Sequence, residues 1–273
     1  MRTRVAAGHT AAMQTKLYVI PTHPCCTAML MLEHKGISYR RIDLPAALHP
    51  LALRLHGFRG NTAPFRDIDG RPHRVLALAD RMGTVPALLC DGSRVMTNRD
   101  IARFLDEVQP DPPLFPAESD GRLAVEQAER WGDEVLQMAA RRLLLAAMLR
   151  GPDGIVNRGE DGRLGPLISR HETARFAVAR LVARFAFAVN ARSEDDLLAT
   201  LPGMLDRIDA WIEAQVLNGE QLYAADFMIA TSLALLCYRP EVPAELERRP
   251  TIRLIDRLLP EPVTTVGSRG GVR

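Results

Sequence analysis

A strand, a loop, a helix and a second strand follow one another within the first 44 residues, and this order restricts the fold most strongly. Lys16–Ile20 is a β-rich apolar run, and Pro21–Pro24 is a loop signal. Cys25–Lys35 predicts a helix, and Gly36 suits the left-handed residue that ends one. Ile37–Leu44 predicts the second strand. Such a unit implies parallel strands joined by a right-handed crossover.

A hairpin and a further helix complete the first half of the chain. Gly83–Gly92 predicts a strand that ends in an Asp-Gly turn, and Ser93–Met96 pairs back onto it. Arg99–Glu107 predicts a helix with Asn98 as its N-cap, because an Asn side-chain oxygen can accept an unpaired helix N–H. The stretch Pro45–Met82 has weak periodicity and predicts no element. The predicted order is therefore βαβ followed by ββα.

The proline-rich run 109–119 predicts a stiff linker between two domains. Beyond it, only helical periodicity is visible, which predicts an all-helical domain with at least four main helices. The predicted helices are Arg122–Arg150, Glu172–Val189, Glu194–Leu217 and Ala224–Leu236. The predicted organisation is a disordered tail 1–14, an α/β domain 15–108 with an insertion at 60–82, the linker 109–119, a helical domain 120–261 and a disordered tail 262–273.

Composition excludes several classes of protein. Of the 273 residues, 47% are hydrophobic and the formal net charge is only +2, so the sequence favours a globular chain and gives no electrostatic case for a nucleic-acid or lipid partner. The longest apolar runs, such as Phe227–Cys237, are about half of a membrane span. Two of the four cysteines are adjacent and two are isolated, which indicates a reducing, cytoplasmic setting and no metal site.

Three local features, in this order and spacing, resemble the glutathione transferase superfamily over roughly Lys16 to Pro260. They are the loop and helix start at Pro21–Cys26, the segment Thr84–Pro86 before a hairpin, and Leu222–Phe227 at the start of an apolar helix. The resemblance implies a thioredoxin-like N-terminal domain and an α-helical C-terminal domain of the glutathione transferase type. It also implies a homodimer, glutathione as co-substrate without a metal, and a small electrophile as the second substrate. The segment 60–82 departs from the family pattern.

The helix start carries the candidate catalytic residues. A cysteine in the first turn of a helix lies near unpaired N–H groups and the positive end of the dipole, and both lower the thiol pKa. The resemblance implies that this loop supplies the group that handles the glutathione sulfur; Cys25 is the first candidate, as in cysteine-using bacterial classes. His23 would lower a neighbouring thiol pKa if it is close and charged. Alternatively, a cysteine packs here as a small apolar residue, which we expect more for Cys26.

The glutathione-binding candidates come from two later segments. The resemblance implies a cis bond between Val85 and Pro86, after Thr84, which leaves the Val85 backbone free to pair with the cysteinyl part of glutathione. The alternative is an ordinary proline that begins a strand. The resemblance also places the γ-glutamyl carboxylate at the helix start, where Thr97 replaces an acidic or amide residue and Asn98 replaces a serine. A simple N-cap is the alternative there.

Asp226 is predicted to be structural. With Tyr223 as N-cap, Asp226 occupies the third helical position and can accept the Tyr223 N–H, which is half of a capping box.

Three functions remain open from the sequence. In the first, an enzyme holds glutathione along Val85 with its sulfur near Cys25, and the electrophile lies between the domains beside the first long helix of the second. In the second, a binding or regulatory protein keeps the fold without the chemistry. In the third, a thiol–disulfide oxidoreductase acts through Cys25 or Cys26. A trans Val85–Pro86 bond, or a Cys25 directed away from this edge into the interior, would overturn the first and leave only the architecture.

Overall fold

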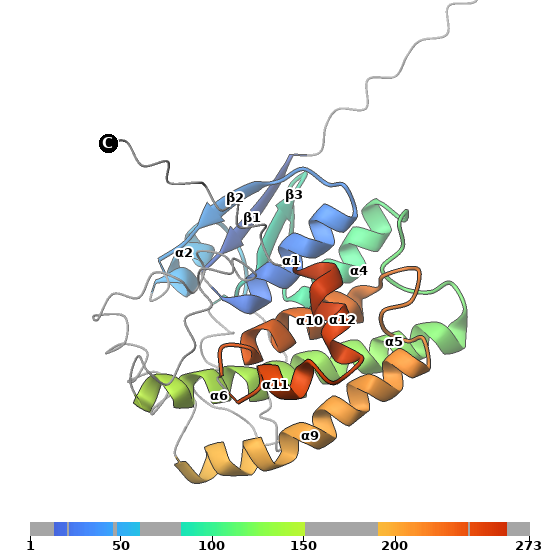
Figure 1. Cartoon of the computed structure of the whole chain (residues 1–273). Coiled ribbons are helices and arrows are strands. Elements are labelled where there is room, and N and C mark those ends of the chain that lie inside the picture. The colour runs from blue at the N-terminus through green and yellow to red at the C-terminus, as the bar shows by residue number, and fades with distance from the viewer. Residues whose placement is uncertain are drawn as a thin grey trace, which may run out of the picture.

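The structure is a computed structural model that describes residues 14–20, 22–45, 48–60, 83–150, 191–239 and 241–260. Residues 61–82 of the predicted insertion, the predicted helix 172–189, residues 1–13 and the tail 262–273 lie outside the described residues. Figure 1 shows a small sheet at one side of the molecule and stacked helices at the other.

The sheet has four strands in the order β2-β1-β3-β4. Strand β1 (Thr15–Val19) pairs in parallel with β2 (Arg40–Asp43), and helix α1 (His23–His34) connects them. Strands β3 (Ala87–Cys90) and β4 (Ser93–Met96) add two antiparallel pairings. The βαβ unit and the following hairpin that the sequence predicts are therefore confirmed.

The boundaries of α1 and β2 differ from those predicted. Helix α1 begins two residues earlier, at His23, because Pro24 fits the first turn, where its missing N–H is not needed. Gly36 follows with φ of +65°, as predicted for the left-handed residue after a helix. Strand β2 covers only four of the eight predicted residues.

Successive side chains of β1 point to opposite faces of the sheet. Leu17 and Val19 pack into the main core with buried residues of α1 and of helix α4 (Asn98–Val108). Tyr18 packs on the other face with Leu53 and Phe58.

Leu53 belongs to helix α2 (His49–Leu55), which the sequence analysis did not predict. With seven residues and buried Pro50 and Leu53, this helix is too short to give a clear periodicity.

From Ser119 onward, the described elements are all helical. They are α5 (Ser119–Trp131), the π-helical turn η1 (Gly132–Leu136), α6 (Gln137–Arg150), α9 (Ala191–Glu213), α10 (Ala224–Leu236), α11 (Pro243–Leu246) and α12 (Thr251–Leu258). Every residue of α10 is buried, and this helix packs against α1, α5, α6 and α12. Within the described residues, no helix is both long and apolar enough to cross a membrane.

Polar contacts fix both ends of α1. Within the interface of α1 and α10, the hydroxyls of Thr27 and Thr231 lie 2.7 Å apart. At the other end of α1, the Lys35 side chain is fully buried, and its ammonium contacts Asp106 at 2.5 Å and the Gln109 carbonyl at 2.7 Å. The end of α1 is thereby tied to α4 and to the start of the linker.

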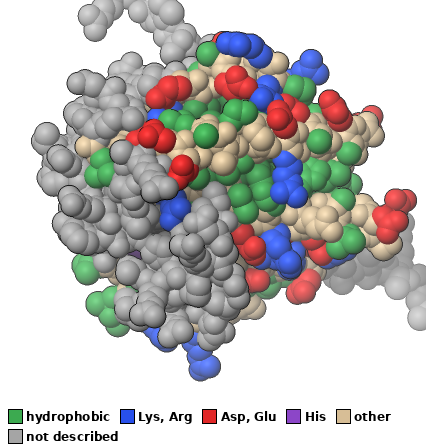
Figure 2. Space-filling model, turned by 90° about the horizontal axis from the view of Figure 1, so that it is seen from below, with side chains coloured by type: hydrophobic (Ala, Val, Ile, Leu, Met, Phe, Trp, Pro, Cys, Tyr) green, Lys and Arg blue, Asp and Glu red, His purple; other side chains and the backbone are tan. Residues whose placement is uncertain are grey.

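The helical half carries charges of both signs. Figure 2 shows acidic and basic side chains interspersed over the described part of its lower face. Arg249, for example, contacts Asp206, Asp209 and Glu245 at 2.7 to 2.9 Å. This described surface therefore presents no broad field of one sign.

Candidate functional site

Strand register brings the three predicted site segments to one end of the sheet. Tyr18 near the end of β1 is paired with Ala87 at the start of β3, and Ala87 is paired with Met96 at the end of β4. The loop into α1, the segment before β3 and the start of α4 must therefore lie next to one another. A hydrogen bond of 3.3 Å from the Thr97 N–H to the Pro86 carbonyl joins two of these segments directly.

Thr22 is the N-cap of α1, but its side chain does not cap the helix. Its hydroxyl donates instead to the Cys25 sulfur at 3.4 Å. Thr22 is half-exposed, whereas Cys25 is completely buried. In this turn, Thr22 is thus the partly exposed residue, and the Cys25 thiol is buried.

The expected low pKa of Cys25 is wrong in this structure. Burial raises the pKa of the Cys25 thiol, and the hydrogen bond from Thr22 offsets only part of this. Burial raises the pKa of Cys26 to about 12. Both sulfurs belong to the main hydrophobic core, so the alternative of apolar packing holds for both cysteines. Cys25 lies in the interior, which is the outcome expected to overturn an enzyme that relies on this thiol.

His23 was expected to lower the pKa of a neighbouring thiol only if it carried a charge, and the structure does not meet this condition. Burial, with a smaller effect of Arg141, lowers the pKa of His23 well below its usual value, so its imidazole is neutral. His23 is 3% exposed, and its Nε2 atom has no hydrogen-bond partner among the described residues. It therefore cannot stabilise a neighbouring thiolate by charge.

The Val85–Pro86 bond is cis, as the resemblance implied. Strand β3 begins at Ala87, one residue after this bond, and Thr84 and Val85 are half-buried. Among the described residues, no backbone–backbone hydrogen bond involves Val85. Its N–H and C=O form a short backbone edge at the end of the sheet.

The start of α4 differs from the prediction. Thr97, not Asn98, is the N-cap: its hydroxyl accepts the Asp100 N–H at 3.2 Å. Thr97 has φ of +72°, which is unusual for a β-branched residue and costs on the order of 1–3 kcal/mol. Asn98 is the first helical residue, 4% exposed, and its Oδ1 atom lacks a partner among the described residues. A strained cap and an unpaired amide thus lie side by side.

Ion pairs connect the start of α4 to the helical half. Arg103 binds Glu129 through two hydrogen bonds of 2.9 and 3.1 Å. Arg99 lies 3.8 Å from the same carboxylate and 3.5 Å from Glu134.

Next to these pairs, Asp133 lies on the π-helical turn. Although half-exposed, it is crowded by protein atoms that raise its pKa to about 6, against the smaller effect of Arg99. Acidic groups therefore gather close to the N-terminus of α4.

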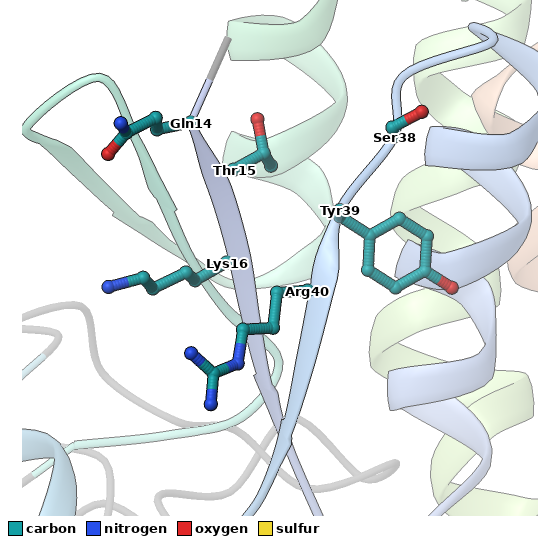
Figure 3. A pocket seen from close by; sticks show the side chains of 6 residues that line it. All are labelled: Gln14, Thr15, Lys16, Ser38, Tyr39 and Arg40. Atoms are coloured by element: carbon teal, nitrogen blue, oxygen red, sulfur yellow. The ribbon is translucent and has the colours of Figure 1, made fainter. Parts of the chain in front are cut away.

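A hollow of about 400 Å³ lies at the opposite end of the sheet. It is open and lined by Gln14, Thr15, Lys16, Ser38, Tyr39 and Arg40. Figure 3 shows Lys16 and Arg40 on one side of the strands and Tyr39 on the other. These residues include none of the predicted site, and they do not converge on one point.

Asp226 lies where the sequence predicted. Its carboxylate accepts the Tyr223 N–H at 2.8 Å and the Asn218 N–H at 2.6 Å, and the residue is fully buried. Burial raises its pKa to about 6, against the effect of these hydrogen bonds.

No protein-family model and no curated protein matches this sequence. Solved structures do match it. A β-etherase from Sphingobium has 17% identity and a TM-score of 0.58, over 91% of this chain and 96% of that one. A glutathione S-transferase of Ceriporiopsis subvermispora in complex with glutathione has 18% identity and a TM-score of 0.57, over 90% and 98%. A transferase-like protein from Pseudomonas syringae has 16% identity and a TM-score of 0.55, over 90% of this chain but 66% of that one.

The chain has the glutathione S-transferase fold. In this fold, the sheet with α1, α2 and α4 is the thioredoxin-like half, and the helices from α5 onward form the helical half.

Within the glutathione S-transferase fold, the structure adds three residues that the sequence analysis missed. Thr22 had a signal, since a threonine before a proline-containing helix start is a common N-cap. Asp133 and Gln137 had none, because only the packed helices bring Asp133 toward Arg99 of α4 and Gln137 toward Met228 of α10.

Proposed function

We propose that this chain is a glutathione S-transferase-like enzyme that binds a glutathione-type thiol and joins its sulfur to a small electrophile. The observation that carries the proposal is the strand register, which gathers the starts of α1, β3 and α4 at one end of the sheet. Each of these segments offers a different group to a small peptide.

The backbone edge at Val85 suits the cysteinyl part of the thiol, because a peptide can pair with it as an added strand. The N-terminus of α4 suits a carboxylate, because its N–H groups and dipole attract anions. The unpaired Oδ1 of the buried Asn98, with Asp133 close to the same end of α4, suits an ammonium group. Together they match the zwitterionic end of a γ-glutamyl peptide.

Thr22, rather than Cys25, is the group we place at the thiol sulfur. Thr22 is half-buried and its hydroxyl donates to the Cys25 sulfur; rotation about the χ1 bond would direct this hydroxyl to an incoming sulfur instead. Such a hydrogen bond favours the thiolate. The thiolate then forms a carbon–sulfur bond with the electrophile, the leaving group departs with the bonding electron pair, and the thiol proton passes to water.

A thiol-binding protein without catalysis is the second candidate. It is favoured by the burial and raised pKa of both cysteines, which remove the nucleophile expected from the sequence. The same facts weigh against a thiol–disulfide oxidoreductase, which requires an accessible thiolate.

The test is calorimetric titration of the protein with glutathione, followed by turnover of 1-chloro-2,4-dinitrobenzene. The variants are Thr22→Val, which keeps the shape of the side chain, and Cys25→Ala. We expect the wild type to bind and turn over, Thr22→Val to bind but lose roughly 100-fold in kcat, the loss typical of one missing donor, and Cys25→Ala to keep most of its activity.

The outcomes separate the candidates. Binding without turnover in the wild type supports the second candidate. Loss of turnover in Cys25→Ala but not in Thr22→Val would contradict the role given to Thr22. Absence of glutathione binding would overturn the proposal.

The homodimer and the cytoplasmic setting remain predictions. Sedimentation equilibrium on the purified chain tests the first.

A further inference from the structure

His34, the last residue of α1, is a half-buried histidine at the junction of the two halves. Its ring lies against the Phe227 ring of α10, and the two ring centroids are 5.1 Å apart. Its Nε2 atom lies 3.3 Å from the Nε2 atom of Gln221, in the loop before α10. The imidazole therefore contacts the helical half through a polar atom as well as through its ring.

Two carbonyl groups fix the orientation of the Gln221 amide. Its Nε2 atom donates to the Pro113 carbonyl of the linker at 3.3 Å and to the Leu222 carbonyl at 3.1 Å. A flipped amide would direct its own oxygen at these two carbonyl oxygens, neither of which can donate a hydrogen bond. The nitrogen of Gln221, and not its oxygen, therefore faces His34.

Only a neutral His34 fits this arrangement. An amide nitrogen can only donate, so the His34 Nε2 atom must accept, which requires the tautomer with its proton on Nδ1. A protonated imidazole carries an N–H group at both nitrogens, so two donors would face each other at 3.3 Å. Rotation of the Gln221 amide to relieve this would bring its oxygen against the carbonyls of Pro113 and Leu222.

The charged groups that act on His34 also disfavour its protonation. Burial, followed by the effects of the cations Lys35 and Arg257, lowers the pKa of His34. Arg257 of α12 is held beside the same loop, because its guanidinium donates to the carbonyls of Gly219 and Glu220 at 2.5 and 2.9 Å.

The acidic residues on the surrounding elements do not offset these cations. No ion pair joins His34 to any of the described carboxylates. This holds for the acidic residues of α1, the linker, the loop, α10 and α12, which are Glu33, Asp111, Glu220, Asp226 and Asp256.

We propose that the contact between His34 and Gln221 is a pH-sensitive switch at the junction of the halves, closed while the imidazole is neutral and opened by its protonation. Next to this contact, the Ala224 N–H donates to the Leu114 carbonyl at 2.9 Å and joins the start of α10 to the linker. Both hydrogen bonds connect the same two segments, so opening of the first is expected to weaken the second.

Hydrogen exchange at the Ala224 N–H measures this opening. A free imidazole titrates near pH 6.5, and the closed contact lowers this value. Between the two pKa values the open state binds more protons, so acidification favours it. After correction for the intrinsic exchange rate, exchange in the wild type is expected to become faster as pH falls from about 7.5 to about 5.5, by up to about tenfold per pH unit in that interval.

Two substitutions show whether His34 causes this dependence. His34→Gln does not titrate, and its side-chain oxygen can accept from Gln221, so this variant is expected to lose most of the pH dependence at Ala224. His56→Gln is the matched control, because His56 is an exposed histidine that lies against Tyr18 of the sheet. This control is expected to keep the dependence of the wild type.

NMR titration of the histidine rings measures the protonation of His34 itself. Gln221→Met keeps the length of the side chain but removes its donor. It is expected to raise the pKa of His34 toward the ordinary value, because a hydrogen bond donated to the neutral imidazole favours the neutral form. A residue that only fills space would leave the titration unchanged.

Each result supports or overturns the switch. An equal pH dependence of Ala224 exchange in the wild type and His34→Gln overturns it, as does a wild-type His34 that titrates at or above about pH 6.5. If His34→Gln does not fold, a His34 pKa that is unchanged in Gln221→Met overturns it. The switch stands or falls separately from the proposed function, because none of these measurements requires a thiol.

Discussion

The N-termini of α1 and α10 solve the same physical problem in different ways. Both must satisfy the unpaired N–H groups of a helix start. At α10, the Asp226 carboxylate lies inside the protein and binds two backbone N–H groups. At α1, a proline occupies the first turn, and the Thr22 hydroxyl contacts a sulfur rather than a backbone N–H.

The difference separates a helix start that is purely structural, at α10, from one that can still bind a ligand, at α1. The first has no capacity left for a ligand, because its carboxylate is buried and bonded on both oxygens. The second keeps the half-buried Thr22 beside N–H groups that no side chain caps. The following predictions test whether stability and function divide between the two ends in this way.

The largest loss of stability is expected at α10. Asp226→Ala leaves the half-buried N–H groups of Tyr223 and Asn218 without their acceptor, which costs about 3 kcal/mol of unfolding free energy. Chemical denaturation measures it, with Asp196→Ala, an exposed position on α9, as the control. A variant that melts like the wild type but loses turnover would reverse the assignment of Asp226 as structural.

The pH dependence of stability tests the same carboxylate. The unfolded chain releases the Asp226 proton near pH 3.9, whereas the folded protein holds it until about pH 6. Between these values the folded state binds more protons, so the unfolding free energy falls as pH rises, by about 3 kcal/mol.

To isolate this effect, the unfolding free energies of the wild type and of Asp226→Asn are measured by denaturation from about pH 3.5 to about pH 7.5, a range that spans the carboxyl pKa values. The difference between the two proteins is then compared across this range. The asparagine variant lacks this titration. A difference that stays level, or that rises with pH, would contradict the raised pKa.

A smaller loss is expected beneath α1. Cys25→Ala removes one buried sulfur from the core and should cost about 1 kcal/mol, because the cavity it leaves is small. Thermal and chemical denaturation measure the change. A gain in stability, which relief of a buried ionised thiolate would produce, would show that the thiol is ionised in the folded protein.

The smallest effect on stability is expected at Thr22. Because its hydroxyl caps no backbone group, Thr22→Val should change the unfolding free energy by less than about 0.5 kcal/mol. A loss of about 1 kcal/mol or more, the usual cost of a lost cap, would make the start of α1 structural, like that of α10.

Periodicity and turn residues predicted the architecture well. The apolar runs of β1 and α10, and the glycine after α1, are local signals that packing did not override. Helix α2 was missed because seven residues give no clear period.

The site was less predictable, because its chemistry depends on burial. A sequence places Cys25 in the first turn of a helix, but not beneath Thr22 in the core. The sequence also places the start of α4 at Thr97 and Asn98. The N-cap is Thr97 instead of the predicted Asn98, because Thr97 adopts a positive φ that a threonine rarely takes. Contacts between distant segments, such as that of Gln137 with Met228, leave no local signal at all.

The pair of hydroxyls on Thr27 and Thr231 has a consequence for how the halves fit together. Two apolar helix faces can shift or rotate relative to each other at little cost in free energy. The hydrogen bond of 2.7 Å between Thr27 and Thr231, in contrast, forms only at one relative position of α1 and α10. Thr27 lies one helical turn beyond His23, and Thr231 lies one turn beyond Phe227, so this hydrogen bond aligns the N-terminal turns of the two helices. It therefore fixes the position of the first turn of α1 relative to the first turn of α10.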